Sequence, residues 1–299
     1  MFSRPLRSVR SSSLIGKLTA MRCSPILLLL LAACGGTPPQ TIDITVAADG
    51  SSTTLAFAAT ATATIHYVAP GGLVELLVDC HPPETTDVRG FAFTATVPGY
   101  TTPERAGYWR YRADLAAGPS TLELVTDGGP ATCTVSLTPA PSACGTLEVF
   151  RSVDTDHTHV APATEPRADW ETFPVSGNHY PVWAGWDRNY DLPIRTGYLL
   201  HDLEHGGIVL SFRCVNVQQS AECTTASADL TVARRLFAQH RTLLTPDPRQ
   251  PALYAARAWR WGYAASCYDT TELQGFMQQR FRHGREDIDS DSAPFDPTQ

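Results

Sequence analysis

The sequence predicts an all-β immunoglobulin-like sandwich, residues 41–139, followed by an α+β domain, residues 144–289. Two observations support this division. Short runs of alternating apolar and polar residues fill the first segment, whereas helical patterns and most of the histidines and tryptophans lie in the second. A chain of 299 residues is also long enough for two domains of about 100–200 residues each.

Four runs in the first segment have the period-two alternation of half-buried strands. Glycine and proline clusters such as 70–72 and 127–130 separate them, as in a small antiparallel sandwich. This half carries no pattern that points to chemistry, so it is predicted to be a spacer or adhesion module that ends at the linker 138–141. The four runs are 60–65, 73–78, 91–97 and 121–125.

The second segment combines helices with a strand. A helix is predicted over 272–283, because Leu273, Phe276, Met277 and Phe281 lie on one helical face. The other predicted elements are helices over 199–205 and 228–241, a strand over 208–212, an apolar run of undetermined type over 252–262, and a disordered acidic tail over 290–299.

Residues 1–33 have the features of a lipoprotein signal peptide. A basic start precedes the apolar run 26–31, which is shorter than the roughly 20 residues needed to cross a bilayer. Residues 31–35, Leu-Ala-Ala-Cys-Gly, resemble the lipobox of bacterial lipoproteins, in which the cysteine, here Cys34, is lipidated and becomes the mature N-terminus. An ordinary signal peptide with a chance cysteine is the alternative, and Met21 is an alternative start because it begins a complete leader.

This leader predicts an envelope protein whose membrane partner is reached through the lipid anchor, with residues 34–40 as a tether. Gly35 follows the cysteine, where an aspartate would favour the inner membrane by analogy with enteric sorting. The outer membrane is therefore preferred, with the domains periplasmic or surface-exposed.

The chain without its leader is strongly acidic. The whole chain has 23 basic and 30 acidic side chains, and the leader holds five of the basic ones and no acid. The remaining 18 basic and 30 acidic side chains give a net charge of −12. Because nucleic acid would be repelled by such a surface, it is excluded as a partner.

Six cysteines remain when Cys23, in the leader, and Cys34 are set aside. An even number in an exported chain, without any Cys-x-x-Cys pair, predicts disulfides in place of a thiolate metal site or a redox motif. Six cysteines permit 15 connectivities. Proximity along the chain favours Cys80–Cys133, which would bridge the sandwich, and Cys214–Cys223, which leaves Cys144 to pair with Cys267.

Histidines gather in three short segments of the α+β domain. His157 and His159 lie on one face of an extended segment, His179 follows a glycine turn, and His201 and His205 share a helix face. Imidazoles that converge from a helix and nearby loops suit Zn²⁺ or Cu²⁺. We therefore predict a divalent metal bound by His179, His201 and His205, with His159 as the next candidate, ahead of His157.

Glu204 lies between the two helical histidines and can be a ligand, support the ligands or act as a catalytic base. The run His-x-x-Glu-His also matches the inverted zinc-peptidase motif, whose third ligand would be Glu272. The domain is small for that fold. A metal-dependent hydrolase acting on envelope material is thus an alternative to simple metal binding, and a metal-free interaction module is another. Whether the protein is an enzyme is left open, as is any protein partner.

Two further features of this segment have structural interpretations. Ser176 lies near His179 and could act as a nucleophile, but serine beside glycine in a turn is usually structural. Clustered aromatic side chains can stack on sugars, but more often they form the core of a small domain. The aromatic residues are Trp170, Tyr180, Trp183, Trp186 and Tyr190.

Residues 174–180, Pro-Val-Ser-Gly-Asn-His-Tyr, and 201–210, His-Asp-Leu-Glu-His-Gly-Gly-Ile-Val-Leu, resemble the bacterial domain of unknown function 3105 (DUF3105). The resemblance extends to 258–262 and to the last helical block, 276–286, and covers about half of the chain. The chain departs from the family at Phe173-Pro174, where a Pro-Pro pair is usual. The resemblance supports the domain boundary and implies no activity, because the family is named for its lack of an assigned function.

Overall fold

The computed structural model describes residues 40–57, 60–81, 91–128, 130–140, 144–162 and 173–288. The predicted signal peptide, the lipidation site Cys34, Trp170 and the predicted tail 290–299 lie outside the described residues. No helix within the described ranges has both the length and the apolar character needed to cross a membrane.

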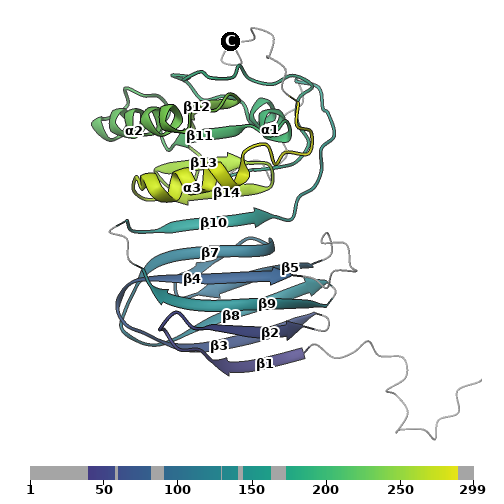
Figure 1. Ribbon diagram of the computed structural model, residues 1–299, viewed down its shortest axis with the longest axis vertical. Helices are drawn as coiled ribbons and strands as arrows, with labels where there is room; N and C mark the ends of the chain where they lie inside the picture. Colours follow the sequence, from purple (N-terminus) through teal and green to yellow (C-terminus); the bar gives the residue numbers. More distant parts are fainter. Residues whose placement is uncertain are drawn as a thin grey trace, which may run out of the picture. The chain divides into compact units, whose positions relative to one another are not determined.

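Strands dominate the first part of the chain and alternate with helices in the second (Figure 1). The elements are β1 (Gln40–Thr45), β2 (Ser52–Phe57), β3 (Ala61–Ala69), β4 (Gly72–His81), β5 (Phe91–Val97), β6 (Tyr100–Thr101), β7 (Arg105–Leu115), β8 (Gly118–Gly128), β9 (Ala131–Pro139), β10 (Leu147–Ser152), α1 (Thr196–Glu204), β11 (Ile208–Phe212), α2 (Ala221–Phe237), β12 (Thr242–Pro246), β13 (Tyr254–Ala258), β14 (Trp261–Ala265) and α3 (Thr270–Arg280).

The N-terminal strands form two hydrogen-bonded sets around one core. One set runs β1-β3-β8-β5 and the other β2-β9-β4-β7, and they meet where Phe93 of β5 pairs with Arg105 of β7. Alternate side chains of both sets, including Ile65 and Val135, pack into a single buried cluster. The predicted β-rich first part is therefore confirmed, while its immunoglobulin-like character stays a prediction.

The C-terminal strands extend from β7 in the order β10-β14-β13-β11-β12, with β11 and β12 parallel and the other pairs antiparallel. Ile208 and Leu210 of β11 pack in one cluster with α2 and α3. Val209, which points to the opposite face, packs in another cluster with Leu199 and Leu203 of α1. The sheet therefore lies between α1 on one face and α2 and α3 on the other, and the histidine-rich helix α1 is separated from them.

The structure corrects two predicted elements. The helix predicted over 228–241 begins earlier, because the Ser220 side chain caps α2 by accepting a hydrogen bond from the Cys223 N–H. It ends before the left-handed Ala238 (φ 53°), so residues 238–241 are not helical. The undetermined run 252–262 forms the hairpin of β13 and β14, with Arg260 at the turn (φ 65°).

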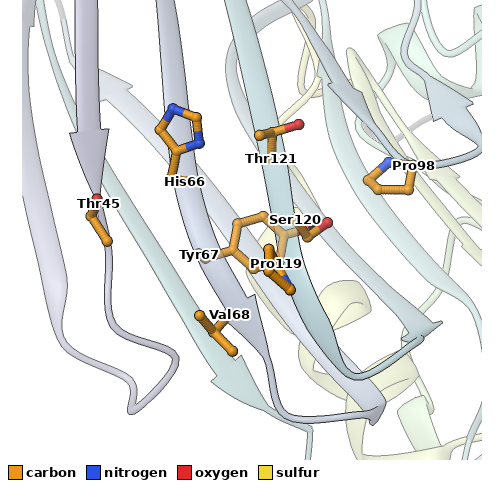
Figure 2. A pocket seen from close by; sticks show the side chains of 8 residues that line it. All are labelled: Thr45, His66, Tyr67, Val68, Pro98, Pro119, Ser120 and Thr121. Carbon is orange, nitrogen blue, oxygen red and sulfur yellow. Dashed lines mark hydrogen bonds between the residues drawn. The ribbon is translucent and has the colours of Figure 1, made fainter.

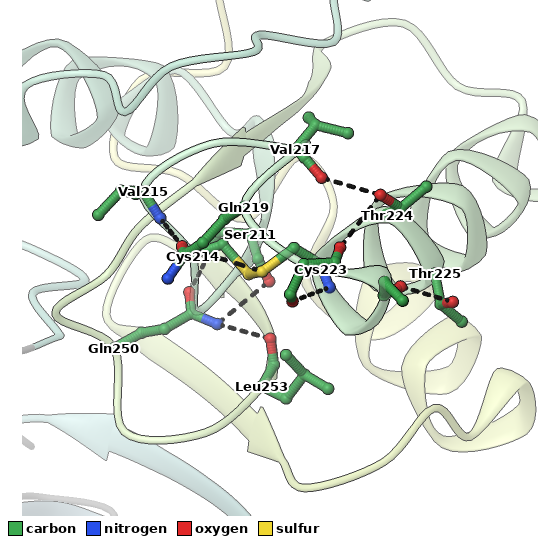
Figure 3. Close-up of a disulfide and its surroundings, with 12 residues drawn as sticks. Ser211, Cys214, Val215, Val217, Gln219, Cys223, Thr224, Thr225, Gln250 and Leu253 are labelled. Carbon is green, nitrogen blue, oxygen red and sulfur yellow. Dashed lines mark hydrogen bonds between the residues drawn. A yellow bond between two sulfur atoms is a disulfide. The ribbon is translucent and has the colours of Figure 1, made fainter.

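The three predicted disulfides are present in the structure. Cys80 and Cys133 are direct partners on the neighbouring strands β4 and β9, so this bond staples adjacent strands and does not bridge two layers. The bond between Cys214 and Cys223 joins the end of β11 to the first turn of α2 (Figure 3). Disulfides of this number are typical of proteins that fold outside the cytoplasm.

Strand pairing continues across the predicted boundary between the two parts. Strand β10 follows that boundary and pairs with β7 on one side and with β14 on the other. The buried Glu148 of β10 accepts a hydrogen bond from Arg105 of β7 at 2.8 Å and another from the Trp109 indole at 3.1 Å. The division into two domains stays a prediction, but the two parts share a continuous sheet.

Candidate metal centre

Helix α1 supplies His201 and Glu204 to the centre. Every residue of α1 is buried, and His205 is the C-cap residue that follows it. His201 and His205 lie one turn apart, with ring centroids 4.5 Å from each other. Gly206 follows with φ +80°, a left-handed conformation that ends the helix directly after the last histidine.

Two loops bring further histidines to α1. The segments around His159 and His179 pair as a short parallel bridge, in which the Val160 N–H donates to the His179 carbonyl at 2.7 Å. The Tyr180 N–H donates to the Gly197 carbonyl at 3.1 Å, which attaches the second loop to α1. Gly197 permits this approach, since a Cβ there would lie 2.7 Å from the Tyr180 ring.

Three imidazoles and one carboxylate converge at this point. Ligand atoms of His159, His179, His201 and Glu204 all lie within 4.8 Å of one another. The His179, His201 and Glu204 side chains are buried, whereas His159 is exposed. The group therefore opens to solvent on the side of His159.

A second group shares Glu204 with the first. It consists of Glu204, His205 and Glu286, again with ligand atoms within 4.8 Å of one another. The Nε2 atom of His205 lies 3.1 Å from Nε2 of His201, so the two groups are contiguous. Glu286 had no signal of its own in the sequence, because it lies in an irregular segment after α3 and belongs to no metal-ligand spacing; only its place in the last DUF3105-like block pointed to it.

Backbone carbonyls fix which nitrogen of each ring carries the proton. Nδ1 of His201 lies 2.6 Å from the Tyr180 carbonyl oxygen, and Nδ1 of His179 lies 3.0 Å from that of Gly177. Because a carbonyl only accepts, both Nδ1 atoms are donors. In a neutral ring the Nε2 atom then has a lone pair. Nε2 of His179 faces Oε2 of Glu204 at 2.9 Å, so a neutral His179 brings two acceptors together.

The electrostatics favour neutral rings at His201 and His205 and an ionised carboxylate at Glu204. Burial, together with the nearby His179 and His205, lowers the pKa of His201 to about 4. Burial also lowers the pKa of His205. Burial alone would raise the pKa of Glu204, but the hydrogen bond and charge of His179 hold it below its ordinary value. Neutral imidazole and carboxylate are the forms that bind metal ions.

The neighbouring Asp202 differs from Glu204. It is completely buried, and burial raises its pKa well above the ordinary value, in spite of the Ala184 N–H that donates to it. It belongs to neither His/Glu group among the described residues. Burial therefore disfavours the charged form of Asp202, and α1 directs only its other acidic residue to the centre.

Other sequence candidates lie elsewhere. Glu272 forms ion pairs with Arg110 and Arg112 of β7 at 2.5 and 2.9 Å, so its expected role as a third zinc ligand is wrong. The Ser176 hydroxyl donates to the Asp154 carbonyl at 2.8 Å and is structural. His157 bonds the Thr155 carbonyl and belongs to neither group in the described ranges.

The aromatic residues of this region are mostly core. Tyr180, Trp186 and Tyr190 are buried. Trp183 is half-buried and packs on the centre, with its ring centroid 5.0 Å from that of His201 and 4.7 Å from that of His205. It forms an apolar wall beside these two imidazoles, a role that the sequence pattern did not reveal.

A pocket of about 390 Å³ on the β-rich first part of the chain contains none of the predicted ligands (Figure 2). It is lined by residues of β3 and β8 such as Tyr67 and Ser120, whose hydroxyls hydrogen bond at 3.1 Å. His66 at its rim pairs with Asp43 at 3.0 Å. The pocket is therefore distinct from the histidine centre.

Comparisons with solved structures and with curated proteins give only weak likenesses. Among solved structures, the chain is similar to a pre-peptidase C-terminal domain of collagenase from Bacillus anthracis (13% identity, 34% of this chain and 99% of that chain, TM-score 0.24). It is also similar to a periplasmic lysozyme inhibitor of g-type lysozyme from Aeromonas hydrophila (16% identity, 32% and 98%, TM-score 0.23). Likenesses of this extent give no indication of function. No curated protein matches the chain.

The family comparison covers the centre itself. Residues 162–292 match the family described as "Protein of unknown function (DUF3105)". This range includes His179, His201, Glu204, His205 and Glu286, while His159 lies just before it. The C-terminal part of this chain, with all but one residue of its histidine centre, belongs to the DUF3105 family.

Proposed function

We propose that this protein is a lipid-anchored envelope protein that binds a divalent metal ion, Zn²⁺ or Cu²⁺, at the histidine centre. The ligands are His159, His179, His201 and Glu204, with His205 adjacent to them. Three imidazoles and one carboxylate match the number and type of ligands that Zn²⁺ takes in tetrahedral sites, and imidazole also suits Cu²⁺.

One observation carries the proposal: a ring nitrogen and a carboxylate oxygen face each other inside a buried site. The Nε2 atom of His179 and Oε2 of Glu204 are 2.9 Å apart, while Nδ1 of His179 is occupied by the Gly177 carbonyl. A buried pair of acceptors is unfavourable unless a cation lies between them. A proton on His179 is one such cation and a metal ion is the other.

The contacts behind the ligands support the metal ion. His179 and His201 each direct Nδ1–H to a backbone carbonyl, which is the usual way in which proteins orient metal-binding imidazoles. Burial lowers the pKa of His201 to about 4, so this ring is neutral near neutral pH and its Nε2 lone pair can bind a metal ion. A cluster that only pins loops would not need neutral rings with converging lone pairs.

Metal content of the purified full chain tests the proposal. The protein is purified without a histidine tag or chelator, offered Zn²⁺ and Cu²⁺, dialysed and analysed by mass spectrometry. We expect at least one tightly held metal ion per chain, with one ion fewer in the His179→Ala/His201→Ala variant and no loss in His283→Ala, whose exposed side chain belongs to neither group in the described ranges. An empty wild type that is folded would leave the metal-free interaction module as the function.

A metal-dependent hydrolase is a second candidate, favoured by the opening of the centre to solvent. His159 is exposed, and the Glu286 side chain is 44% exposed, so water and a substrate can reach the buried ligands from that side. The base would then be His205 or Oε1 of Glu204, the oxygen that does not face His179. Hydrolysis of ester and phosphate reporter substrates that requires metal and is lost in Glu204→Gln would favour this candidate over simple metal binding.

The membrane anchor is part of the proposal and has its own test. The three disulfides support an oxidising compartment, and the lipobox-like residues 31–35 support lipid on Cys34. The chain should fractionate with membranes, preferentially the outer membrane, and incorporate labelled fatty acid. Cys34→Ser should abolish the label, and its persistence would refute the anchor.

A further inference from the structure

We propose that the centre holds two metal ions, with the Glu204 carboxylate bridging them. The first ion is the one proposed above, so the inference rests on that proposed function. The second is bound by Glu204, His205 and Glu286.

The two oxygens of Glu204 have different surroundings. Oε2 faces Nε2 of His179 at 2.9 Å and so belongs to the first group. Oε1 is buried and makes no hydrogen bond with the described residues, and the Arg285 guanidinium approaches it only to 3.7 Å. A buried carboxylate oxygen without a hydrogen bond is costly, and a second cation would satisfy it.

The spacing within the second group suits a metal ion better than direct contact. Nε2 of His205 and Oε2 of Glu286 are 3.7 Å apart, which is too long for a hydrogen bond. Two metal–ligand bonds of about 2.1 Å each span such a gap at a bent angle. His205 is 4% exposed, so its ring is held inside the protein, and its Nε2 atom lies at this gap.

A backbone clamp holds Glu286 in place. The Arg282 N–H donates to the Gly206 carbonyl, and the Glu286 N–H donates to the Glu204 carbonyl, both at 2.9 Å. Gly284 allows this approach, since a Cβ there would lie 2.2 Å from the Glu204 carbonyl oxygen. The segment after α3 is thus fastened to the end of α1 and positions the third ligand.

The second ion has only three protein ligands and lies on the side where Glu286 is exposed. It therefore keeps a coordination position for water or for an oxygen atom of a substrate. Two ions joined by a carboxylate and separated by about 3.5–4 Å form a clamp that can stabilise both the attacking and the leaving oxygen in hydrolysis. The pair of groups thus favours hydrolytic chemistry at the same centre.

Metal stoichiometry of the full chain separates this inference from the proposed function. After loading with excess Zn²⁺ and dialysis, wild type should hold two ions per chain, and Glu286→Gln and His179→Ala/His201→Ala should each hold one. The matched control Glu104→Gln, an exposed acid on the sandwich, should hold two. Circular dichroism checks that each variant is folded.

Each outcome is decisive. One ion in both wild type and Glu286→Gln overturns the second site and leaves the proposed function intact, whereas a folded but empty wild type overturns both. Two ions in Glu286→Gln overturn the role of Glu286. Electron paramagnetic resonance of the Cu²⁺-loaded protein gives an independent readout. We expect a magnetically coupled pair in wild type and an isolated ion in Glu286→Gln, and isolated ions in both would overturn the bridge.

Discussion

The Oε2 atom of Glu204, on helix α1, lies 2.9 Å from Nε2 of His179, on a loop 25 residues earlier in the chain. The carbonyl of Gly177 occupies the other nitrogen of the same ring. A metal ion between these two atoms would join the loop to the helix, so metal binding and folding stability should be linked.

Zn²⁺ is therefore expected to raise the unfolding temperature of the wild type. A ligand present at 100 times its Kd stabilises the folded state by about 2.7 kcal/mol. Substituting His179→Gln should abolish the increase, because the ring that faces Glu204 is lost. The control is His66→Gln, which alters an exposed histidine of the sandwich and should leave the increase unchanged. An equal increase in His179→Gln would show that Zn²⁺ stabilises the protein elsewhere.

Two glycines provide a matched pair for the packing behind the centre. Gly197→Ala places a methyl group 2.7 Å from the ring of Tyr180. The backbone carbonyl of Tyr180 accepts the hydrogen bond that orients His201. Overpacking of this kind costs about 1–3 kcal/mol, and metal affinity should fall with it. Gly275→Ala meets nothing within 4 Å on helix α3 and should stabilise by up to about 1 kcal/mol. Urea unfolding measures the stability of the two variants, and Zn²⁺ titration measures their metal affinity. Similar effects of the two substitutions would contradict the role of Gly197 in the packing behind the centre.

A buried ion pair predicts loss of stability in acid. Burial alone would raise the pKa of Asp247, but the charges of Arg257 and Arg249 hold it below its ordinary value. A lowered folded-state pKa stabilises the protein above the unfolded pKa of about 3.9, and this contribution is lost as the pH falls through the folded value. The side chains of Asp247 and Arg257 are only 3% and 2% exposed. Asp247→Asn should therefore destabilise by about 3–5 kcal/mol at pH 7.

The stability difference between wild type and Asp247→Asn should shrink as the pH falls below about 4, because the wild type itself loses the ionised carboxylate. Urea unfolding at pH 7 and pH 3 measures the two differences. A difference that stays constant between these pH values would mean that the ionised Asp247 is not the stabilising form.

Ion pairs between α3 and β7 are expected to couple the two parts of the chain. Glu272 accepts hydrogen bonds from Arg110 and Arg112, and the Arg112 side chain is 2% exposed. Glu272→Gln should cost about 1.5–3 kcal/mol, the range for hydrogen bonds to charged groups. Calorimetry should show one transition in wild type, because β10 continues the sheet of β7. Two separate transitions in wild type would refute this coupling.

The disulfides should differ in their contribution to stability according to the loop that each closes. Cys144 and Cys267 are 123 residues apart, whereas Cys214 and Cys223 are 9 apart. In the chain-entropy description a loop of about 100 residues contributes roughly 4.7 kcal/mol and one of about 15 residues roughly 3. Replacing the first pair by serines should therefore lower the unfolding temperature more than replacing the second. The reverse order would mean that native-state packing, and not loop closure, dominates.

The sequence alone determined the features that depend on short-range pattern. Period-two alternation located four of the strands in the β-rich first part, and proximity along the chain favoured the cysteine pairs that the structure contains. The pairing of His201 with His205 was also predictable, because residues four apart are neighbours on the surface of any helix. The end of α2 was less predictable, because a left-handed residue such as Ala238 leaves no periodic signal.

The tertiary structure alone decided how the histidine centre is assembled. The backbone bridge between two loops brings His159 to His179, and the clamp after α3 brings Glu286 to His205. The same folding takes Glu272 away to the arginines of β7. These placements depend on backbone hydrogen bonds and glycine contacts between segments distant in the sequence, and no local pattern encodes such convergence. Residue type therefore determined which ligand atoms are available, and long-range packing determined which of them lie together in one centre.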